Sequence, residues 1–587
     1  MFSKVLVANR GEIAIRVMRT LEELGVGTVA VYSEPDRDAP HVRRAADAYL
    51  LGPGPPTESY LNVEKILEVA QRAGVDAVHP GYGFLAENAA FARACDEAGV
   101  TFIGPPAEAI EAMGSKTRAR ELMRDAGVPI VPGTTDPVET VEDAKEVAAE
   151  VGYPVAFKAA GGGGGKGFRV AESEDDLEGA FEGASREGEK FFSDSTVYIE
   201  RYLPDPRHVE VQVLADSHGN VVHLFERDCS VQRRHQKLIE ESPAPAVDPE
   251  LRERIGKIGT DAARAVGYRS AGTVEGLLAD GDYYFLEMNT RVQVEHCVTE
   301  MVTGVDIVRE QVKIATGEEL SFGQDDVVIR GHAIECRINA EDASKNFAPA
   351  PGKVGSYREP AGPFVRVDSG VEEGYEVLPL YDPMIAKLIV WDVDREASTR
   401  RMLRALGEYE IGGLKTLVPF HEALLQTEQW ARGETCRDLV EDRDWLKRLA
   451  FPKREQADEE EEVGKVEREY AVEVSGRKFD VKVIGPPASP NGAAPGAALP
   501  ARKPPKRREG GGGAGGAAGE LVSPIQGTVL KVAVEKGAEV DEGALICVIE
   551  AMKMENEITA PVAGTVEELG VSEGGAIATG DTIAVIR

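Results

Sequence analysis

The chain has 587 residues, of which 42% are hydrophobic, and its formal net charge is -34 at pH 7. This length is too great for one core and predicts roughly three to five domains, while the acidic balance disfavours nucleic acid and anionic membranes as partners. No apolar stretch reaches about eighteen residues and no export signal precedes the first strand, so neither membrane insertion nor secretion is expected. The six cysteines lack Cys-x-x-Cys spacing, which disfavours a zinc site and a disulfide scaffold and favours a reducing, cytoplasmic location.

In residues 1–114, short apolar runs typical of strands alternate with segments whose apolar residues have helical spacing. The run Val5 to Ala8 predicts a buried strand, the apolar spacing from Ile13 to Leu24 predicts a helix, and Thr28 to Tyr32 predicts a second strand. This order indicates a parallel α/β domain. Because no Gly-x-Gly-x-x-Gly follows the first strand, we expect a scaffold and not a dinucleotide pocket.

A glycine-rich segment, Gly161 to Gly167, lies within residues 115–327, which form a second predicted domain. It stands between two short apolar strands, Pro154 to Lys158 and Phe168 to Val170. Backbone N–H groups of such a loop can approach phosphate oxygens closely, because no Cβ intervenes. No Ser or Thr and no helix follow its Gly-Lys pair, so it is not a P-loop. A plain linker and a mobile lid, at about residues 131–203, both remain open.

Two glutamates and an asparagine come from neighbouring predicted strands. Glu275 ends the run Thr273 to Glu275, and Glu287 and Asn289 follow the apolar run Tyr283 to Leu286. Hard oxygen ligands of this kind suit Mg²⁺ (or Mn²⁺) that carries nucleotide phosphates. Acidic residues on strands usually face solvent, but these flank apolar runs, where an unpaired carboxylate would be costly. The sequence therefore predicts a metal and nucleotide site here.

Residues 328–449 predict a mixed α/β domain, and residues 450–519 predict a linker. The linker segment contains a possible hairpin, Tyr470 to Val483, and becomes rich in Pro, Ala and Gly after Pro486. That composition cannot bury enough apolar surface to fold. The basic cluster Arg502 to Arg508 could be a nucleic-acid patch or a nuclear signal, but its setting favours a solvated linker.

Residues 520–587 contain one short pattern twice, Pro524-x-x-Gly527-Thr528-Val529 and Pro561-x-x-Gly564-Thr565-Val566. Each copy opens a run of small and β-branched residues, so the repeat predicts two similar half-sheets related by a pseudo-twofold axis. The segment Glu550 to Met554 lies midway between the copies, where a hairpin would hold Lys553 in solvent. An ordinary surface lysine is the simplest alternative, but the motif and the repeat together favour an attachment site.

The segment Ala551-Met552-Lys553-Met554 resembles the motif of the biotinyl carrier domains of biotin-dependent carboxylases. The resemblance implies an all-β, lipoyl-like flattened barrel on a flexible linker, with biotin joined to Lys553 by an amide. Lipoyl carriers share this fold, but the two methionines that flank the lysine favour biotin.

Residues 1 to about 446 closely resemble biotin carboxylases of the ATP-grasp superfamily, through Ala8 to Ala14 and the highly specific run Glu287 to Glu295. The resemblance implies an α/β multidomain body: an N-terminal parallel α/β domain, an ATP-grasp domain with a Gly-rich lid, and a mixed α/β C-terminal domain. It implies that Glu275, Glu287 and Asn289 hold Mg²⁺. It also implies ATP contacts from Lys116, Lys158, Gly164, Gly165, Glu200, Leu203, His208, Gln232 and His235.

Bicarbonate is the second substrate that this resemblance implies. Attack on the γ-phosphate would give carboxyphosphate, which releases CO2 and phosphate before biotin is carboxylated, and this chemistry requires cations and a base. Two positions, Gly276 and Cys297, depart from the bulky aromatic and the proline common in the family, but neither removes a reacting group. The implied roles are bicarbonate binding by Lys237, Arg291, Gln293 and the backbone of Val294, proton acceptance by Glu295, and stabilisation of the biotin enolate by Arg337.

Together the resemblances imply a biotin carboxylase plus carrier chain, the α subunit of an acetyl-CoA or propionyl-CoA carboxylase. Since no segment remains for a carboxyltransferase, a biotin protein ligase and a separate β subunit are the expected partners. A homodimeric body within a larger α/β complex is also implied. The interval 447–519 is too short for the β-barrel often found in α chains for longer substrates. The alternatives are the carboxylase chain of a split pyruvate or other 2-oxoacid carboxylase, and a non-catalytic biotin-bearing module.

Overall fold

The computed structural model describes residues 1–134, 136–159, 167–192, 194–449, 466–474, 477–485, 520–523, 527–541, 543–551, 554–572, 575–577 and 581–587. The chain divides into a large unit, made mainly of residues 1–450, and a smaller unit that contains most of the C-terminal strands. Among the described residues, no helix is long and apolar enough to cross a membrane.

The N-terminal segment forms a five-stranded sheet in the order β3-β2-β1-β4-β5, and every pairing in it is parallel. The predicted parallel α/β arrangement is therefore confirmed. The helix predicted from Ile13 begins at Gly11 and buries Ile13, Val17 and Leu21 against the sheet. The elements are β1 (Lys4–Val7), α1 (Gly11–Glu23), β2 (Gly27–Ser33), α2 (Pro40–Arg44), β3 (Asp47–Gly52), α3 (Val63–Ala73), β4 (Ala77–His79), α4 (Ala89–Glu97), β5 (Thr101–Phe102) and α5 (Ala107–Gly114).

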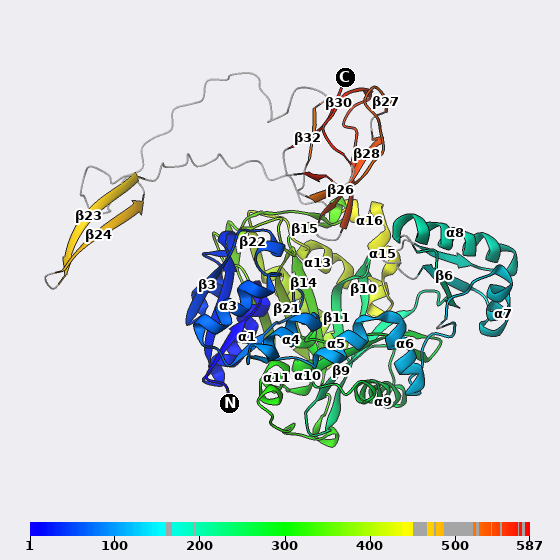
Figure 1. Ribbon diagram of the computed structural model, residues 1–587, viewed down its shortest axis with the longest axis horizontal. Helices are drawn as coiled ribbons and strands as arrows, with labels where there is room; N and C mark the ends of the chain where they lie inside the picture. Colours follow the sequence, from blue (N-terminus) through cyan, green and yellow to red (C-terminus); the bar gives the residue numbers. More distant parts are fainter. Residues whose placement is uncertain are drawn as a thin grey trace. The chain divides into compact units, whose positions relative to one another are not determined.

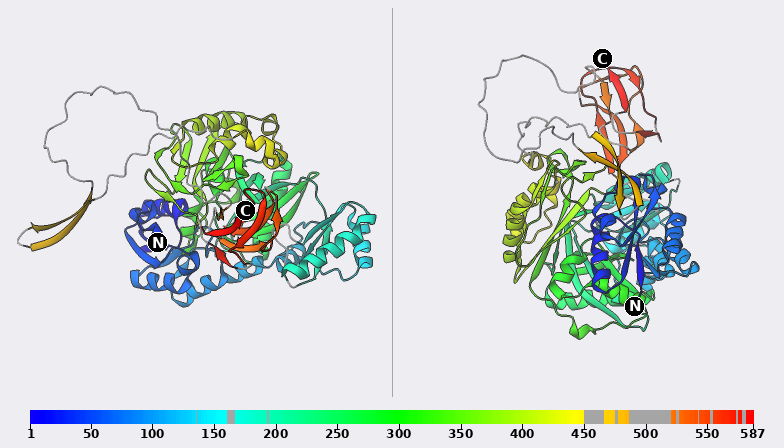
Figure 2. Two further views of the ribbon diagram at one scale, coloured as in Figure 1. Left: turned by 90° about the horizontal axis from the view of Figure 1, so that it is seen from above. Right: turned by 90° about the vertical axis from the view of Figure 1, so that its left-hand side faces the viewer.

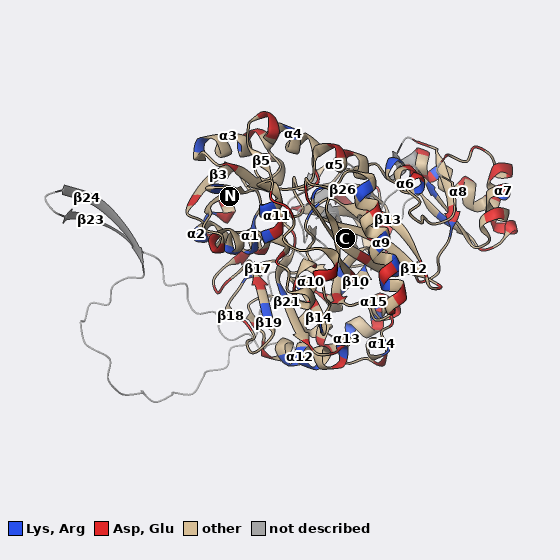
Figure 3. Ribbon diagram, turned by 90° about the horizontal axis from the view of Figure 1, so that it is seen from below, with Lys and Arg blue, Asp and Glu red and all other residues tan. Residues whose placement is uncertain are grey.

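A small antiparallel sheet, in the order β7-β6-β8, carries two helices and lies at one side of the large unit (Figures 1 and 2). Thr140 and Asp143 form a reciprocal capping box that starts its first helix. Acidic residues mark both helices, α7 and α8 (Figure 3). Residues 161–166 of the glycine-rich segment, Gly164 and Gly165 among them, lie outside the described residues. The elements are α6 (Lys116–Asp125), α7 (Val141–Val151), β6 (Val155–Ala159), β7 (Phe168–Ala171), α8 (Glu174–Phe192) and β8 (Val197–Arg201).

An eight-stranded antiparallel sheet, in the order β13-β12-β9-β10-β11-β14-β21-β19, forms the centre of the large unit. Residues 115–327 and 328–449, the two segments predicted as separate domains, both contribute strands to this sheet, because β11 pairs with β14. Alternate residues of β9, such as Val209 and Val211, pack into an apolar core, and the residues between them face the opposite side. The strands are β9 (Arg207–Ala215), β10 (Val221–Arg233), β11 (Gln236–Ser242), β12 (Ser270–Ala279), β13 (Asp282–Asn289), β14 (His332–Asn339), β19 (Val365–Ser369) and β21 (Met384–Asp392).

Helices cover this sheet, and most of the longer ones start at a side-chain cap. Asp248 caps the longest of them, which has Pro249 in its first turn, and Asp394 caps the helix that follows β21. These helices are α9 (Pro249–Ala265), α10 (His296–Thr303), α11 (Ile307–Ala315), α12 (Arg395–Glu408), α13 (Val418–Leu425), α14 (Glu428–Ala431), α15 (Arg437–Glu441) and α16 (Arg443–Lys447). Short strands complete the unit: β15 (Glu341–Asp342), β16 (Ala348–Pro349), β17 (Gly352–Lys353), β18 (Ser356–Arg358), β20 (Glu376–Val377) and β22 (Glu410–Gly412).

The smaller unit contains two four-stranded sheets, β25-β32-β30-β27 and β29-β28-β26-β31, as the sequence repeat predicts. Gly527 starts β26 in one sheet and Gly564 starts β30 in the other. The predicted hairpin is present as β23 and β24, which pair in antiparallel register. Lys553 lies outside the described residues, between the end of β28 and the start of β29. The strands are β23 (Val466–Val474), β24 (Arg477–Gly485), β25 (Glu520–Val522), β26 (Gly527–Val532), β27 (Glu539–Val540), β28 (Leu545–Ala551), β29 (Met554–Thr559), β30 (Gly564–Leu569), β31 (Ala576–Ile577) and β32 (Thr582–Ile586).

Candidate active site

A buried lysine on β11 lies among three carboxylates. The Nζ atom of Lys237 donates to Glu210 at 2.5 Å, to Glu275 at 2.8 Å and to Glu295 at 2.7 Å. Burial alone would lower the pKa of Lys237, but these carboxylates raise it well above its usual value. The lysine is therefore charged, and it holds together side chains from β9, β12 and the loop before α10.

The predicted metal ligands lie on neighbouring strands, as expected. Glu275 on β12 is directly opposite Glu287 on β13, and Thr273 is opposite Asn289 in the same pairing. Burial opposes ionisation of Glu275, but Lys237 and His208 lower its pKa well below the usual value. Two carboxylates and an amide oxygen form an oxygen-rich set, which fits Mg²⁺.

Glu295 is the N-cap residue of α10 and bridges two cations. One carboxylate oxygen accepts from Lys237, and the other accepts from Nη2 of Arg337 at 2.9 Å. Despite burial, Lys237 and Arg337 hold the pKa of Glu295 well below its usual value. Glu295 is therefore ionised at neutral pH, in the form that can accept a proton. Arg337 also donates from Nε to Glu240 at 2.6 Å.

The loop after β13 brings the predicted bicarbonate ligands next to these groups. Gln293 donates from Nε2 to Glu275 at 2.5 Å. Arg291 donates to Glu87 at 2.9 Å and to the side-chain oxygen of Asn289 at 3.1 Å. The carbonyl of Val294 accepts from Lys387 at 2.6 Å. Gln293 and Arg291 thus both contact predicted metal ligands.

Four of the predicted nucleotide ligands lie next to other predicted site residues. Nε2 of His208 lies 2.9 Å from Glu275, and Gln232 is directly opposite Lys237 in the pairing of β10 with β11. Lys158 and Glu200 form an ion pair on the small sheet, between β6 and β8. The remaining placements are a buried Leu203, an exposed His235 in the turn after β10, and Lys116 at the start of α6, whose side chain is outside the described part of the structure.

Sequence reasoning missed three buried charged residues that complete the site: Glu210, Arg227 and Glu240. Glu210 accepts from Lys237, and Glu240 accepts from Arg337. The alternation of polar and apolar residues along β9 was a usable signal, because it places Glu210 on the same face as His208. Arg227 gave no such signal, since it lies in a mixed polar run of β10.

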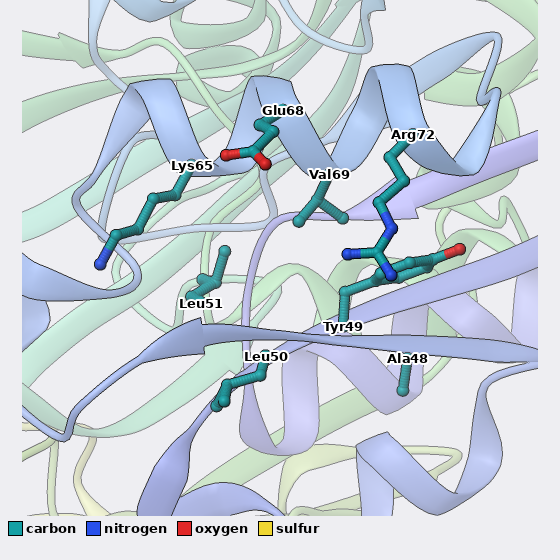
Figure 4. Close-up of a pocket in the computed structure, with 8 residues that line it drawn as sticks. All are labelled: Ala48, Tyr49, Leu50, Leu51, Lys65, Glu68, Val69 and Arg72. Carbon is teal, nitrogen blue, oxygen red and sulfur yellow. The ribbon is translucent and has the colours of Figure 1, made fainter.

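A cavity of about 420 Å³ lies elsewhere, between β3 and α3 of the N-terminal sheet (Figure 4). Its walls include Tyr49, Leu50, Lys65 and Arg72, and none of the predicted site residues lines it. The cavity therefore does not mark the predicted chemistry, which is built on the polar side chains of the eight-stranded sheet.

Comparison with known proteins bears on the large unit first. Family models match in chain order: "Biotin carboxylase, N-terminal domain" at residues 1–110, "Carbamoyl-phosphate synthase L chain, ATP binding domain" at residues 115–322, and "Biotin carboxylase C-terminal domain" at residues 335–442. Biotin carboxylase 1 of Bacillus subtilis is 55% identical over 443 residues, which are 75% of this chain and 98% of that protein. The chain belongs to the biotin carboxylase family.

This biotin carboxylase is also similar to proteins that are named for 2-oxoacid carboxylases. A pyruvate carboxylase subunit from Methanothermobacter thermautotrophicus is 55% identical over 442 residues, 75% of this chain and 90% of that protein. A crystal structure of the Hydrogenobacter thermophilus 2-oxoglutarate carboxylase biotin carboxylase domain dimer, in complex with MgADP, ADP and bicarbonate, gives a TM-score of 0.70 at 48% identity and covers 77% of this chain and all of that chain. The model "Biotin-requiring enzyme" matches residues 517–586. The chain is thus a biotin carboxylase, a ligase, with a biotin carrier domain, and the predicted fold class is confirmed.

The structure shows the surroundings of the two positions at which the sequence departs from the family, and a neighbouring side chain compensates at Gly276. The ring of Tyr283 covers Gly276, where a Cβ atom would lie 2.2 Å from the ring. The hydroxyl of Tyr283 donates to the carbonyl of Val274 at 3.1 Å, so the tyrosine supplies the bulk that residue 276 lacks. Cys297 is fully buried and its pKa is raised by that burial, as expected for an inert thiol.

Proposed function

We propose that this biotin carboxylase uses ATP and bicarbonate to carboxylate biotin that is attached to Lys553 of the same polypeptide. The observation that carries the proposal is the contact of Lys237 with both Glu275 and Glu295. It joins a carboxylate suited to a metal with an ionised carboxylate suited to accept a proton. The bicarbonate and MgADP in the related 2-oxoglutarate carboxylase structure support the same pair of substrates.

The metal and nucleotide roles follow from the donor set. Glu275, Glu287 and Asn289 would hold Mg²⁺ (or Mn²⁺), which neutralises charge on the nucleotide phosphates when it is bound. The residues proposed to contact ATP are Lys116, Lys158, Gly164, Gly165, Glu200, Leu203, His208, Gln232 and His235.

The bicarbonate chemistry is assigned to the buried polar network. Glu295 takes the bicarbonate proton, since Lys237 and Arg337 keep it ionised. Lys237, Arg291, Gln293 and the backbone of Val294 hold the anion near the triphosphate, where positive charge and N–H donors offset its repulsion by the phosphates. Arg337 stabilises negative charge on biotin during carboxyl transfer.

The acceptor of the carboxyl group is proposed to be an acyl-CoA, acetyl-CoA or propionyl-CoA, bound by a separate carboxyltransferase β subunit. Biotin protein ligase would load Lys553 in the cytoplasm. The body would form a homodimer, and the dimer named in the related crystal structure supports this part of the proposal. A 2-oxoacid acceptor is the second candidate, favoured by the relatives that are named for pyruvate carboxylase and 2-oxoglutarate carboxylase.

Two measurements test these proposals. ADP release by the biotinylated chain should depend on bicarbonate and should be lost in Glu287→Ala, whereas equal ADP release without bicarbonate would contradict the chemistry. The β subunit that copurifies with the chain should then carboxylate acetyl-CoA or propionyl-CoA. Carboxylation of pyruvate or 2-oxoglutarate instead would favour the second candidate.

A further inference from the structure

One arginine beneath the site uses every N–H group that it has. The side chain of Arg227 on β10 is fully buried. Its Nε donates to Glu210 at 2.6 Å and its Nη1 donates to Gln212 at 2.7 Å and to Thr299 at 3.0 Å. Its Nη2 donates to Gln293 at 2.7 Å and to Thr273 at 3.2 Å. A guanidinium has five N–H donors, so the network satisfies all of them.

The contact with Gln293 fixes which end of its amide faces the site. Arg227 can only donate, so the oxygen of Gln293 must point toward it. The Nε2 group of Gln293 then points toward Glu275, to which it donates at 2.5 Å. An amide in the opposite orientation would bring its oxygen toward Glu275 and toward a bound anion, which would be repulsive.

The contact of Arg227 with Glu210 also helps to position the buried Lys237. Glu210 accepts from Arg227 through one oxygen and from Lys237 through the other. The carboxylate of Glu210 thus bridges the ammonium group of Lys237 and the guanidinium of Arg227, whose Nη1 group is in turn held by Gln212 and Thr299.

We infer that Arg227 is a positioning residue for bicarbonate: it sets the amide orientation of Gln293 directly and the place of Lys237 through Glu210. This inference rests on the proposed roles of Gln293 and Lys237. It does not make Arg227 a catalytic residue, since all its described hydrogen bonds go to protein side chains.

The test is a double-mutant cycle in the full biotinylated chain, with Arg227→Lys, Gln293→Ala and both together. Arg227→Lys should raise the KM for bicarbonate by about tenfold to hundredfold, as expected for the loss of charge-assisted hydrogen bonds. The KM for ATP should stay within about twofold, and the bicarbonate effect should shrink at least about threefold in the Gln293→Ala background, because coupled residues are not additive. Arg252→Lys is the matched control, since the described hydrogen bonds of Arg252 go to Glu226 and to a backbone carbonyl, outside the site.

Several results would overturn the inference. These are a bicarbonate KM within about twofold of wild type, an equal rise in both KM values, or the same fold-change in both backgrounds. If Arg227→Lys does not fold, Glu210→Gln replaces it in the cycle, since it breaks the carboxylate bridge between Arg227 and Lys237; an unchanged bicarbonate KM in that variant also overturns the inference. A wild-type chain without bicarbonate-dependent ADP release would instead refute the proposed function itself.

Discussion

Replacing Glu295 by glutamine removes the proposed base and keeps the shape of its side chain. The fold should tolerate the change, because Lys237 retains Glu210 at 2.5 Å and Glu275 at 2.8 Å, and Arg337 retains Glu240 at 2.6 Å. Loss of general-base catalysis lowers rates by about 100-fold to 10,000-fold. This range corresponds to about 3 to 5 kcal/mol of activation free energy. We expect that loss in kcat for bicarbonate-dependent ADP release.

Glu240 supplies the matched control. Like Glu295 it is buried and accepts a hydrogen bond from Arg337, but it has no proposed contact with bicarbonate. Glu240→Gln should therefore lower kcat by less than about tenfold, because Arg337 keeps its bond to Glu295. Equal losses in the two variants, or a Glu295→Gln enzyme with more than about a tenth of the wild-type rate, would refute the assignment of the base.

The pH dependence gives a second check on the same residue. Lys237 and Arg337 hold the pKa of Glu295 well below its usual value in spite of its burial, so Glu295 stays ionised at neutral and mildly acidic pH. The rate of the wild-type enzyme should then show no acid limb from Glu295 between about pH 6 and 8. A limb in that range that disappears in Glu295→Gln would contradict the ionised form.

Three further predictions concern the metal, a structural ion pair and the carrier. Chelation with EDTA should abolish ADP formation and Mg²⁺ or Mn²⁺ should restore it, while Glu287→Gln should raise the required metal concentration about tenfold or more; full activity in EDTA would exclude the metal role. Burial opposes ionisation of Asp36, but Arg10 lowers its pKa from 3.8 to about 2, which is worth about 2 kcal/mol of folding free energy at neutral pH. In urea unfolding at pH 7, the free energy of unfolding of Asp36→Asn should be lower than that of the wild type by at least this amount. The difference between the two proteins should narrow as the pH falls from about 4 toward 2, because protonation of Asp36 removes the same stabilisation from the wild type. A difference that stays constant over this pH range would contradict an ion-pair origin of the stabilisation. Intact-mass analysis after coexpression with biotin protein ligase should show one added biotin in the wild type and none in Lys553→Arg.

The sequence was most informative where local periodicity and pairing agree. Glu275 and Glu287 could be expected on one face because adjacent antiparallel strands place alternate residues side by side. The repeat around Gly527 and Gly564 predicted two similar sheets because each copy of the pattern begins a strand. In these cases the relevant contacts are formed by neighbouring strands or by repeated local patterns.

The buried polar network could not be predicted in this way. Arg227 meets Gln293, which is 66 residues away, and Lys237 meets Glu295, which is 58 residues away. Alternation along a strand indicates that a side chain faces the polar side of a sheet, but it does not identify the partner that satisfies its charge. The choice of partner depends on strand order, and the order β12-β9-β10-β11 is not the order of these strands in the sequence.

The motif Ala8 to Ala14 illustrates the difference between a family signature and a reacting group. Asn9 donates to the carbonyls of Pro80 and Tyr82, both at 2.7 Å, and so closes the end of the first strand. Arg10 binds Asp36 through Nε at 2.6 Å and also meets Tyr375, which is 365 residues away. Of these contacts, the one with Tyr375 joins the N-terminal sheet to the segment after β19, and none of them involves Lys237 or its carboxylates. The described contacts of Asn9 and Arg10 are structural, whereas the proposed reaction is assigned to the charged network around Lys237.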